Sequence, residues 1–233
     1  MFEVSAQTGE PLRALVWDLD GTLIDSVEDL ADALNVLMNE HHLAHHEVDS
    51  VRNMIGNGVA RLIEMGFAHA GREIGTEGAQ DLVPRFLDIY GARATCKTRL
   101  ADGAVEVLDT LGKAGFVHAV CTNKPHRLSV QILDDLGVLG RISAVIGGDS
   151  TAKKKPDAEP ILACLAALGV AAKDTVMVGD SRVDVEAARA AGIPVIAVSY
   201  GYSAVPVRQL SPDAVIDSLA ELPAELASLG RAA

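Results

Sequence analysis

The chain has 233 residues, of which 49 % are hydrophobic and 22 % are charged, and these proportions exclude collagen, a low-complexity tail and an intrinsically disordered chain. With 20 basic and 32 acidic residues the formal charge is −12, so we expect no nucleic-acid partner and no binding to an anionic membrane surface. The three cysteines form no CxxC pair, and no segment has the pattern of a signal peptide or a transmembrane helix, so we expect a reduced, cytoplasmic protein.

Five short segments rich in Val and Ala are predicted to be buried parallel strands, because each is apolar and ends in polar residues. Helical patterns separate them, and several end at glycines suited to helix C-caps, such as Gly169 and Gly192. This alternation predicts right-handed βαβ crossovers and an α/β fold with a doubly wound, Rossmann-like parallel sheet. The predicted strands are 14–17, 119–121, 144–146, 176–178 and 194–198, and the helical patterns lie in 105–111, 128–136, 161–168 and 185–191.

Residues from about 27 to 98 interrupt the alternation. They contain no convincing strand and instead show apolar residues at helical spacing, for example Leu30, Leu34 and Leu37. An all-helical insert after the first strand predicts a cap beside the sheet. We therefore assign residues 1–26 and 99–233 to a catalytic core and residues 27–98 to a helical cap, with hinges at 25–27 and 100–103.

The first candidate site is the segment Asp18–Gly21, which directly follows the first predicted strand. Gly21 allows the backbone to turn sharply, so Asp18 and Asp20 can face the same crevice. Ligands of open α/β sheets bind outside the carboxyl ends of the strands. A pair of aspartates taken alone is also typical of a helix N-cap or an Asx-turn, so other groups must decide the interpretation.

Complementary groups lie near other predicted strand ends. Acidic residues indicate a hard divalent cation such as Mg²⁺, which keeps water and phosphate oxygens among its ligands, and a nearby hydroxyl and lysine match a phosphoryl group. The alternative for Asp180 and Asp184 is an N-cap and a first-turn acid of the next helix. The groups are Thr122, Asn123 and Lys124 after strand 119–121, Lys155 before Pro156 and between strands 144–146 and 176–178, and Asp180, Ser181 and Asp184 after strand 176–178.

Four segments resemble the four motifs of the haloacid dehalogenase superfamily and occur along the chain in the same order as those motifs. The resemblance is to the branch with a helical cap inserted after the first motif. Four such motifs in order, each at a strand end, are highly specific, and the resemblance covers residues 14–219. Within the superfamily the chain is most similar to phosphoglycolate phosphatases, through segments 55–59 and 122–125. The four motif segments are Asp18–Leu23, Thr122, Lys155–Pro156 and Gly179–Asp184.

The resemblance implies a role for each of these residues. Asp18 would be the nucleophile that forms an aspartyl phosphate, and Asp20 the general acid and then the general base. Lys155, which the resemblance favours over Lys154 because it directly precedes Pro156, would neutralise the nucleophile and the transferring group. Mg²⁺ would be the cofactor, held by Asp18, Asp180 and the backbone carbonyl of Asp20. The remaining residues are Thr122 and Asn123, which would bind phosphoryl oxygens, and Ser181 and Asp184, which would lie beside the metal ligands.

The substrate is a less direct inference. Phosphoglycolate carries a carboxylate in addition to its phosphate, so the cap should supply a positive group that faces the core. Arg61 is our candidate because it lies one helical turn after the loop 56–58, and Asn57 in that loop is the other cap residue assigned to the substrate. A solvated arginine on a helix surface is an equally good interpretation of Arg61.

Four functions are open at this point. The first is a phosphatase for a small phosphate monoester, with phosphoglycolate, another small sugar phosphate or a pyrophosphate as substrate. A phosphomutase of the β-phosphoglucomutase kind shares Asp18 and Asp20 but returns the phosphoryl group to a sugar. A dehalogenase is disfavoured because it lacks the second acid, and an inactive binding protein because every reacting group is present. We expect a small-molecule phosphate ester as partner, and a monomer or homodimer.

Overall fold

Six parallel strands form the main sheet of the computed structural model, which describes residues 12–232. The predicted fold class, α/β with a doubly wound parallel sheet, is confirmed. Residues 1–11, which we assigned to the core, lie outside the described residues. In spatial order the strands are β5 (Ala144–Ile146), β4 (Val117–Cys121), β1 (Ala14–Trp17), β6 (Thr175–Gly179), β7 (Val195–Val198) and β8 (Ala214–Ile216).

The central strand β1 is buried along its whole length, which explains its uninterrupted apolar sequence. In the register of the sheet, Trp17 lies beside Val120 of β4 and Val178 of β6. The chain therefore leaves these three strands at the same level. Asp18 and the segments after residues 121 and 179 consequently emerge together at one edge of the sheet.

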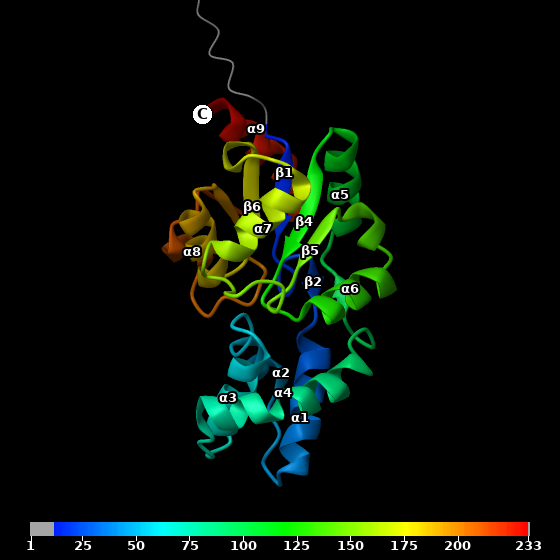
Figure 1. Cartoon of the computed structure of the whole chain (residues 1–233), viewed down its shortest axis with the longest axis vertical. Coiled ribbons are helices and arrows are strands. Elements are labelled where there is room, and N and C mark those ends of the chain that lie inside the picture. The colour runs from blue at the N-terminus through cyan, green and yellow to red at the C-terminus, as the bar shows by residue number, and fades with distance from the viewer. Residues whose placement is uncertain (1–11, 233) are drawn as a thin grey trace, which may run out of the picture.

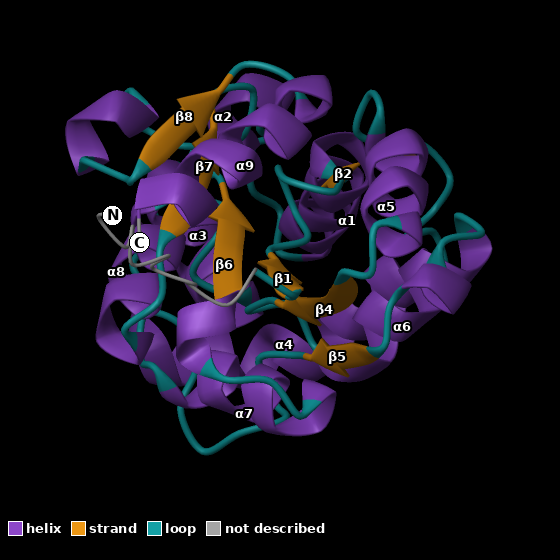
Figure 2. Ribbon diagram, turned by 90° about the horizontal axis from the view of Figure 1, so that it is seen from above, coloured by secondary structure: helices purple, strands orange, loops and turns teal. Residues whose placement is uncertain are grey.

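Helices cover both faces of the sheet (Figure 2). One face packs against α5 (Ala104–Lys113), α6 (His126–Asp135) and α9 (Leu222–Ala232), and the other packs against α7 (Glu159–Leu168) and α8 (Arg182–Ala191). A hydrophobic core lies on each face of the sheet, and alternate residues of β1 pack into the two cores, Leu15 and Trp17 on the first face and Val16 on the second. All three side chains are fully buried. Helices, sheet and helices therefore form the three layers expected of a doubly wound sheet.

Four further helices pack together beyond the carboxyl ends of the strands, beneath the sheet in Figure 1. They are joined to the sheet by a short antiparallel ribbon in which β2 (Ile24–Asp25) pairs with β3 (Arg99–Leu100). The segment 27–98, which we expected to form a helical cap, holds these helices, and the expected hinges 25–27 and 100–103 lie at the ribbon. The helices are α1 (Val27–Glu40), α2 (Val48–Arg52), α3 (Val59–His69) and α4 (Gly75–Gly91).

The sequence analysis missed five of the strands and α-helices and shifted some strand ends by one or two residues. The missed elements are β2, β3, α2, β8 and α9. β8 is a three-residue strand at the sheet edge that pairs only with β7, so it lacks the buried apolar run that revealed the other strands. Gly169 and Gly192 are the C-caps of α7 and α8, as predicted, with φ angles of +66° and +70°. None of the described helices combines the length and apolar character needed to cross a membrane.

Candidate active site

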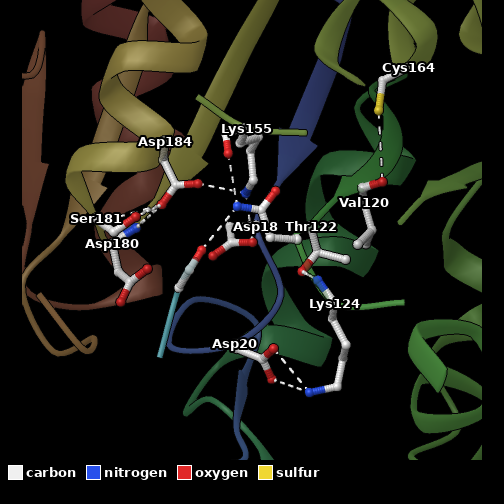
Figure 3. A network of polar contacts seen from close by, with 12 residues as sticks. Asp18, Asp20, Val120, Thr122, Lys124, Lys155, Cys164, Asp180, Ser181 and Asp184 are labelled. Carbon is white, nitrogen blue, oxygen red and sulfur yellow. Dashed lines mark hydrogen bonds and ion pairs between the residues drawn. The ribbon is translucent and has the colours of Figure 1, made fainter. Parts of the chain in front are cut away.

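A buried lysine connects two carboxylates below the end of β1 (Figure 3). Nζ of Lys155 lies 2.8 Å from Oδ1 of Asp18 and 2.6 Å from Oδ1 of Asp184. Burial by itself would lower the pKa of Lys155, but Asp18 and Asp184 raise it above its usual value. The structure therefore brings Lys155 into the site, whereas Nζ of Lys154 lies 3.3 Å from the backbone oxygen of Asn57.

Asp18, Asp180 and Asp184 form a compact acidic group. One carboxylate oxygen from each lies within 4.8 Å of the others, and all three residues are buried. Burial, together with the charge of Asp184, raises the pKa of Asp18 to about 7, and the same two causes raise the pKa of Asp180 well above its ordinary range. A single lysine does not balance three carboxylates, so this set of oxygens fits a divalent cation.

The N-terminus of α8 holds Asp184 in place. Oδ2 of Asp184 accepts hydrogen bonds from the Ser181 hydroxyl at 2.6 Å and from the backbone N–H groups of Ser181 at 3.0 Å and Asp180 at 3.2 Å. This is a capping box, so Ser181 is the N-cap and Asp184 is the first-turn acid. A Cβ at Gly179 would lie 2.5 Å from Cβ of Asp184, which only glycine avoids. One carboxylate oxygen of Asp184 therefore caps helix α8, and the other binds Lys155.

Asp180 is enclosed by two turns that come from distant parts of the chain. Its Oδ2 accepts a hydrogen bond of 2.5 Å from the backbone N–H of Tyr202, in the loop after β7. A Cβ at Gly201 would lie 2.2 Å from Cβ of Asp180, and a Cβ at Gly21 would lie 2.5 Å from its Oδ2. Gly21 also has a φ of +87°, which favours glycine. The sequence analysis predicted the sharp turn at Gly21 but did not identify the loop that contains Tyr202.

Asp20 is held apart from the acidic group, by different partners (Figure 3). Its two carboxylate oxygens lie 2.8 and 3.0 Å from Nζ of Lys124, and Oδ1 also accepts a hydrogen bond of 2.5 Å from the Ser26 hydroxyl. Lys124 is buried, and its Nζ lies 4.7 Å from the centre of the Tyr90 ring. We expected only the backbone carbonyl of Asp20 to reach the metal, and its side chain is indeed not one of the three clustered acids.

Lys124 and Ser26 are residues of this site to which the sequence analysis gave no role. Lys124 was named among the groups after strand 119–121 and in the segment 122–125, and Ser26 lies three positions after the first motif segment, Asp18–Leu23. Local spacing could not identify the partner of Lys124, because Lys124 and Asp20 are 104 positions apart, whereas Ser26 lies only six positions from Asp20. The motif membership of Lys124 was the available indication.

Thr122 and Asn123 lie at the end of β4, next to the reacting groups. The Thr122 hydroxyl accepts the backbone N–H of Lys124 at 3.2 Å. The Asn123 amide donates to the backbone oxygens of Gly56 and Lys155, both at 3.0 Å, while its Oδ1 is buried without a partner. Asn123 thus connects the sheet to the loop before α3.

A small cavity lies between the strand ends and the helices α1, α3 and α4. Its volume is about 40 Å³, which has room for no more than a few water molecules. Asp18, Asp20 and Thr122 line it from the sheet side, and apolar residues such as Leu30 and Leu62 line it from the helical side. Of the residues predicted to bind the substrate, Thr122 and Asn123 line this cavity together with Asp18 and Asp20.

The two predicted cap residues do not line this cavity. The Arg61 guanidinium lies 2.6 Å from Oε2 of Glu64 on its own helix, and its side chain is 53 % exposed. Asn57 contacts the core through its backbone oxygen, which accepts from Lys154. The exposed ion pair at i,i+3 matches the interpretation of Arg61 as a solvated helix arginine.

The comparisons with known proteins agree with one another. A sequence model described as haloacid dehalogenase-like hydrolase matches residues 15–198. The chain is 41 % identical over 209 residues to a phosphoglycolate phosphatase of Caulobacter vibrioides, covering 90 % of this chain and 88 % of that protein. It is 40 % identical over 214 residues to one from Rhodospirillum rubrum, covering 90 % and 89 %. A crystal structure described as a predicted phosphoglycolate phosphatase of Haemophilus somnus superimposes with a TM-score of 0.85 and 30 % identity, covering 92 % of this chain and 98 % of that one.

Proposed function

Because the chain belongs to the haloacid dehalogenase-like hydrolase family, as its four motifs predicted, we propose that it is a magnesium-dependent phosphatase that hydrolyses 2-phosphoglycolate. The contact of Lys155 with Asp18, beside a buried group of three carboxylates, carries the proposal. The names of the relatives support the reaction and the substrate. They also favour a phosphatase over the phosphomutase and the dehalogenase considered above.

Asp18 and Asp180 are the residues that we expect to hold Mg²⁺, together with the backbone carbonyl of Asp20. Both oxygens of Asp184 are engaged, one by Lys155 and the other by the N-terminus of α8, which leaves Asp18 and Asp180 with free carboxylate oxygens. When bound, the ion would neutralise charge on the phosphoryl oxygens and orient them. The clustering of buried acidic oxygens supports this assignment.

The chemistry then divides between the two aspartates of the first motif. A carboxylate oxygen of Asp18 attacks phosphorus while the bond to the ester oxygen breaks, and Lys155 orients the nucleophile from 2.8 Å away. Asp20 donates its proton to the departing alkoxide. Asp20 next accepts a proton from the water that attacks the aspartyl phosphate, which releases phosphate and restores Asp18. The separate surroundings of the two acids support these different roles.

The segment 27–98 acts, in our proposal, as a cap that opens to admit the substrate. The present cavity of about 40 Å³ holds only a few water molecules, and helices α1, α3 and α4 form one of its walls. The antiparallel ribbon of β2 and β3 joins these helices to the sheet through only two residues per strand. Rotation about this ribbon would widen the cavity without disturbing the strand ends.

Phosphate release from a panel of phosphate monoesters tests the function directly. We expect the highest kcat/KM for 2-phosphoglycolate, full loss of activity on addition of EDTA, and recovery on addition of Mg²⁺. Phosphate release that requires a hexose bisphosphate activator would indicate the phosphomutase instead. Activity without any divalent cation would contradict the proposed role of Asp180.

We propose Lys124, in place of Arg61, as the positive group for the substrate carboxylate. Lys124 lines the cavity beside Asp20, whereas Arg61 lies on an exposed helix face. A charge-assisted hydrogen bond is worth about 1.5–3 kcal/mol, which corresponds to a factor of roughly 10 to 150. We therefore expect Lys124→Met to lower kcat/KM for phosphoglycolate by that factor more than for ethyl phosphate, an alkyl ester that needs the same acid but lacks a carboxylate.

Arg61→Ala is the matched comparison for this experiment, and we expect it to change the ratio of the two substrates by less than about 3-fold, as for an exposed ion pair. A selective loss of phosphoglycolate turnover in Arg61→Ala would instead restore the assignment made from the sequence. Equal losses for both substrates in Lys124→Met would mean that Lys124 serves only to hold Asp20.

A further inference from the structure

One buried tyrosine connects the two halves of the site. The backbone N–H of Tyr202 donates to Oδ2 of Asp180 at 2.5 Å. Its phenol oxygen donates to Oδ1 of Asp25 at 2.6 Å and accepts the backbone N–H of Ser26 at 2.7 Å. Tyr202 is only 6 % exposed. It therefore bridges a carboxylate at the end of β6 and the junction between β2 and α1, which are far apart in the sequence.

Ser26 transmits this contact to the general acid. It is the N-cap residue of α1, but its side chain makes no capping hydrogen bond. N-cap serines ordinarily bond to the first turn of their own helix. Here the hydroxyl donates to Oδ1 of Asp20 at 2.5 Å instead, and the buried N–H of Ser26 is satisfied by Tyr202. The serine is thus turned toward the site and away from its helix.

The ring of Tyr202 is also held from the helical side. The guanidinium carbon of Arg52, the last residue of α2, lies 5.1 Å from the ring centre. The Tyr202 ring is therefore in contact with a cation, and its backbone is held by the hydrogen bond to Asp180. The phenol oxygen has little freedom to leave Asp25 and Ser26 while these contacts last.

We propose that Tyr202 is a positioning residue that holds Ser26, and through its hydroxyl the carboxylate of Asp20, at a set place relative to Asp180. Tyr202 touches no reacting atom. It supplies one rigid connection between the carboxylate that we expect to bind the metal and the acid that protonates the leaving group. The proposal rests on the proposed function, because it concerns the acid step of that reaction.

Tyr202→Phe tests the connection, since it removes only the phenol oxygen and keeps both the ring and the backbone N–H. An alkyl phosphate such as phosphoglycolate needs a proton on its leaving group, whereas the nitrophenolate of para-nitrophenyl phosphate leaves without one. We expect Tyr202→Phe to lower the single-turnover rate of phosphoryl transfer from phosphoglycolate by about 10- to 100-fold, as misplacement of a catalytic group does, and from the aryl ester by less than about 3-fold. Equal losses for both esters, or no loss, would overturn the proposal.

Tyr200→Phe is the matched control from the same loop. The phenol of Tyr200 donates to the backbone oxygen of Thr22 at 2.8 Å and has no bond to Asp25 or Ser26 among the hydrogen bonds of the described residues. We expect it to change the ratio of the two esters by less than about 3-fold, as for the loss of one ordinary hydrogen bond. A selective loss of alkyl ester turnover in Tyr200→Phe would assign the effect to the loop as a whole and overturn the specific role of Tyr202.

Two further measurements test whether Tyr202 acts through Ser26 or through Asp180. Ser26→Ala should show the same selective loss, and Tyr202→Phe added to it should slow phosphoglycolate turnover no further, because the two residues act in series. Additive losses would contradict that route. The Mg²⁺ concentration for half-maximal activity should be unchanged in Tyr202→Phe, because the backbone N–H still holds Asp180. A several-fold increase would mean that Tyr202 serves the metal side instead.

The result for Asp20 distinguishes failure of this proposal from failure of the function. If Asp20→Asn shows the selective loss for alkyl esters but Tyr202→Phe does not, the phosphatase mechanism stands and the positioning role is wrong. If Asp20→Asn shows no selectivity, the acid step itself is wrong. Circular dichroism of each variant should match the unmodified protein, which establishes that the differences arise in a folded chain.

Discussion

Asp18→Asn is expected to reduce turnover of phosphoglycolate to background, by at least about 10⁴-fold, because the amide cannot replace the carboxylate as a nucleophile toward phosphorus. The carboxylate of Asp18 is the only one of the acidic group that lies at the end of the central strand and contacts Lys155 without serving a helix terminus. The same substitution should abolish the phosphoenzyme that acid quenching traps during turnover of the unmodified protein.

The Asp18→Asn chain should remain folded. Desolvation and the charge of Asp184 raise the pKa of Asp18, so the folded protein holds this negative charge at a cost, and the substitution removes it. Lys155 keeps its partner Asp184 at 2.6 Å. Asp109→Asn, which removes an equal charge from an exposed ion pair with Arg141, is the control and should retain full activity. Activity in Asp18→Asn close to that of this control would contradict the aspartyl phosphate.

Asp20→Asn is expected to slow hydrolysis of phosphoglycolate by about 10²- to 10⁴-fold, the usual contribution of general acid–base catalysis. The first step should be slowed much less for an aryl phosphate, because a phenolate leaves without a proton. Single-turnover phosphoryl transfer from the two esters measures this difference. Equal slowing of both esters would argue against the acid role.

The substitution at Asp20 also leaves Lys124 buried without its carboxylate partner. Unpaired buried charges destabilise proteins strongly, so the melting temperature of Asp20→Asn should fall, and Lys124→Met added to it should restore part of the loss. This thermal measurement separates the stability effect from the catalytic one. An unchanged melting temperature would mean that water or Tyr90 compensates Lys124.

The apolar strand segments and the motifs at their ends were predictable from the sequence. A strand buried on both faces, such as β1, must be apolar along its length, so it is visible without any knowledge of its neighbours. The carboxyl ends of parallel strands share one edge of the sheet. Residues directly after such strands, including Asp18, Thr122 and Asp180, must therefore lie near one another, and the structure brings them to one edge.

Local sequence also predicted features whose cause lies within one element. Gly169 and Gly192 end their helices in left-handed conformations, which is a property of the helix terminus alone. The capping box at the start of α8 is equally local, but the sequence analysis considered Asp180 as the N-cap, whereas the structure has Ser181 in that position and Asp184 as the first-turn acid. The preference for Lys155 over Lys154 followed from the neighbouring Pro156, and only the former is buried beside Asp18.

Only the tertiary structure decided which partners these residues have across the molecule. Lys124 and Asp20 are 104 positions apart, and Tyr202 and Asp25 are 177 apart, so no periodicity or spacing connects them. Arg61 was assigned to the substrate from its position after a loop, but the rotation of α3 places it on the exposed face beside Glu64. Side-chain direction on a helix depends on how the helix packs, and that is settled by the apolar surfaces of the whole chain.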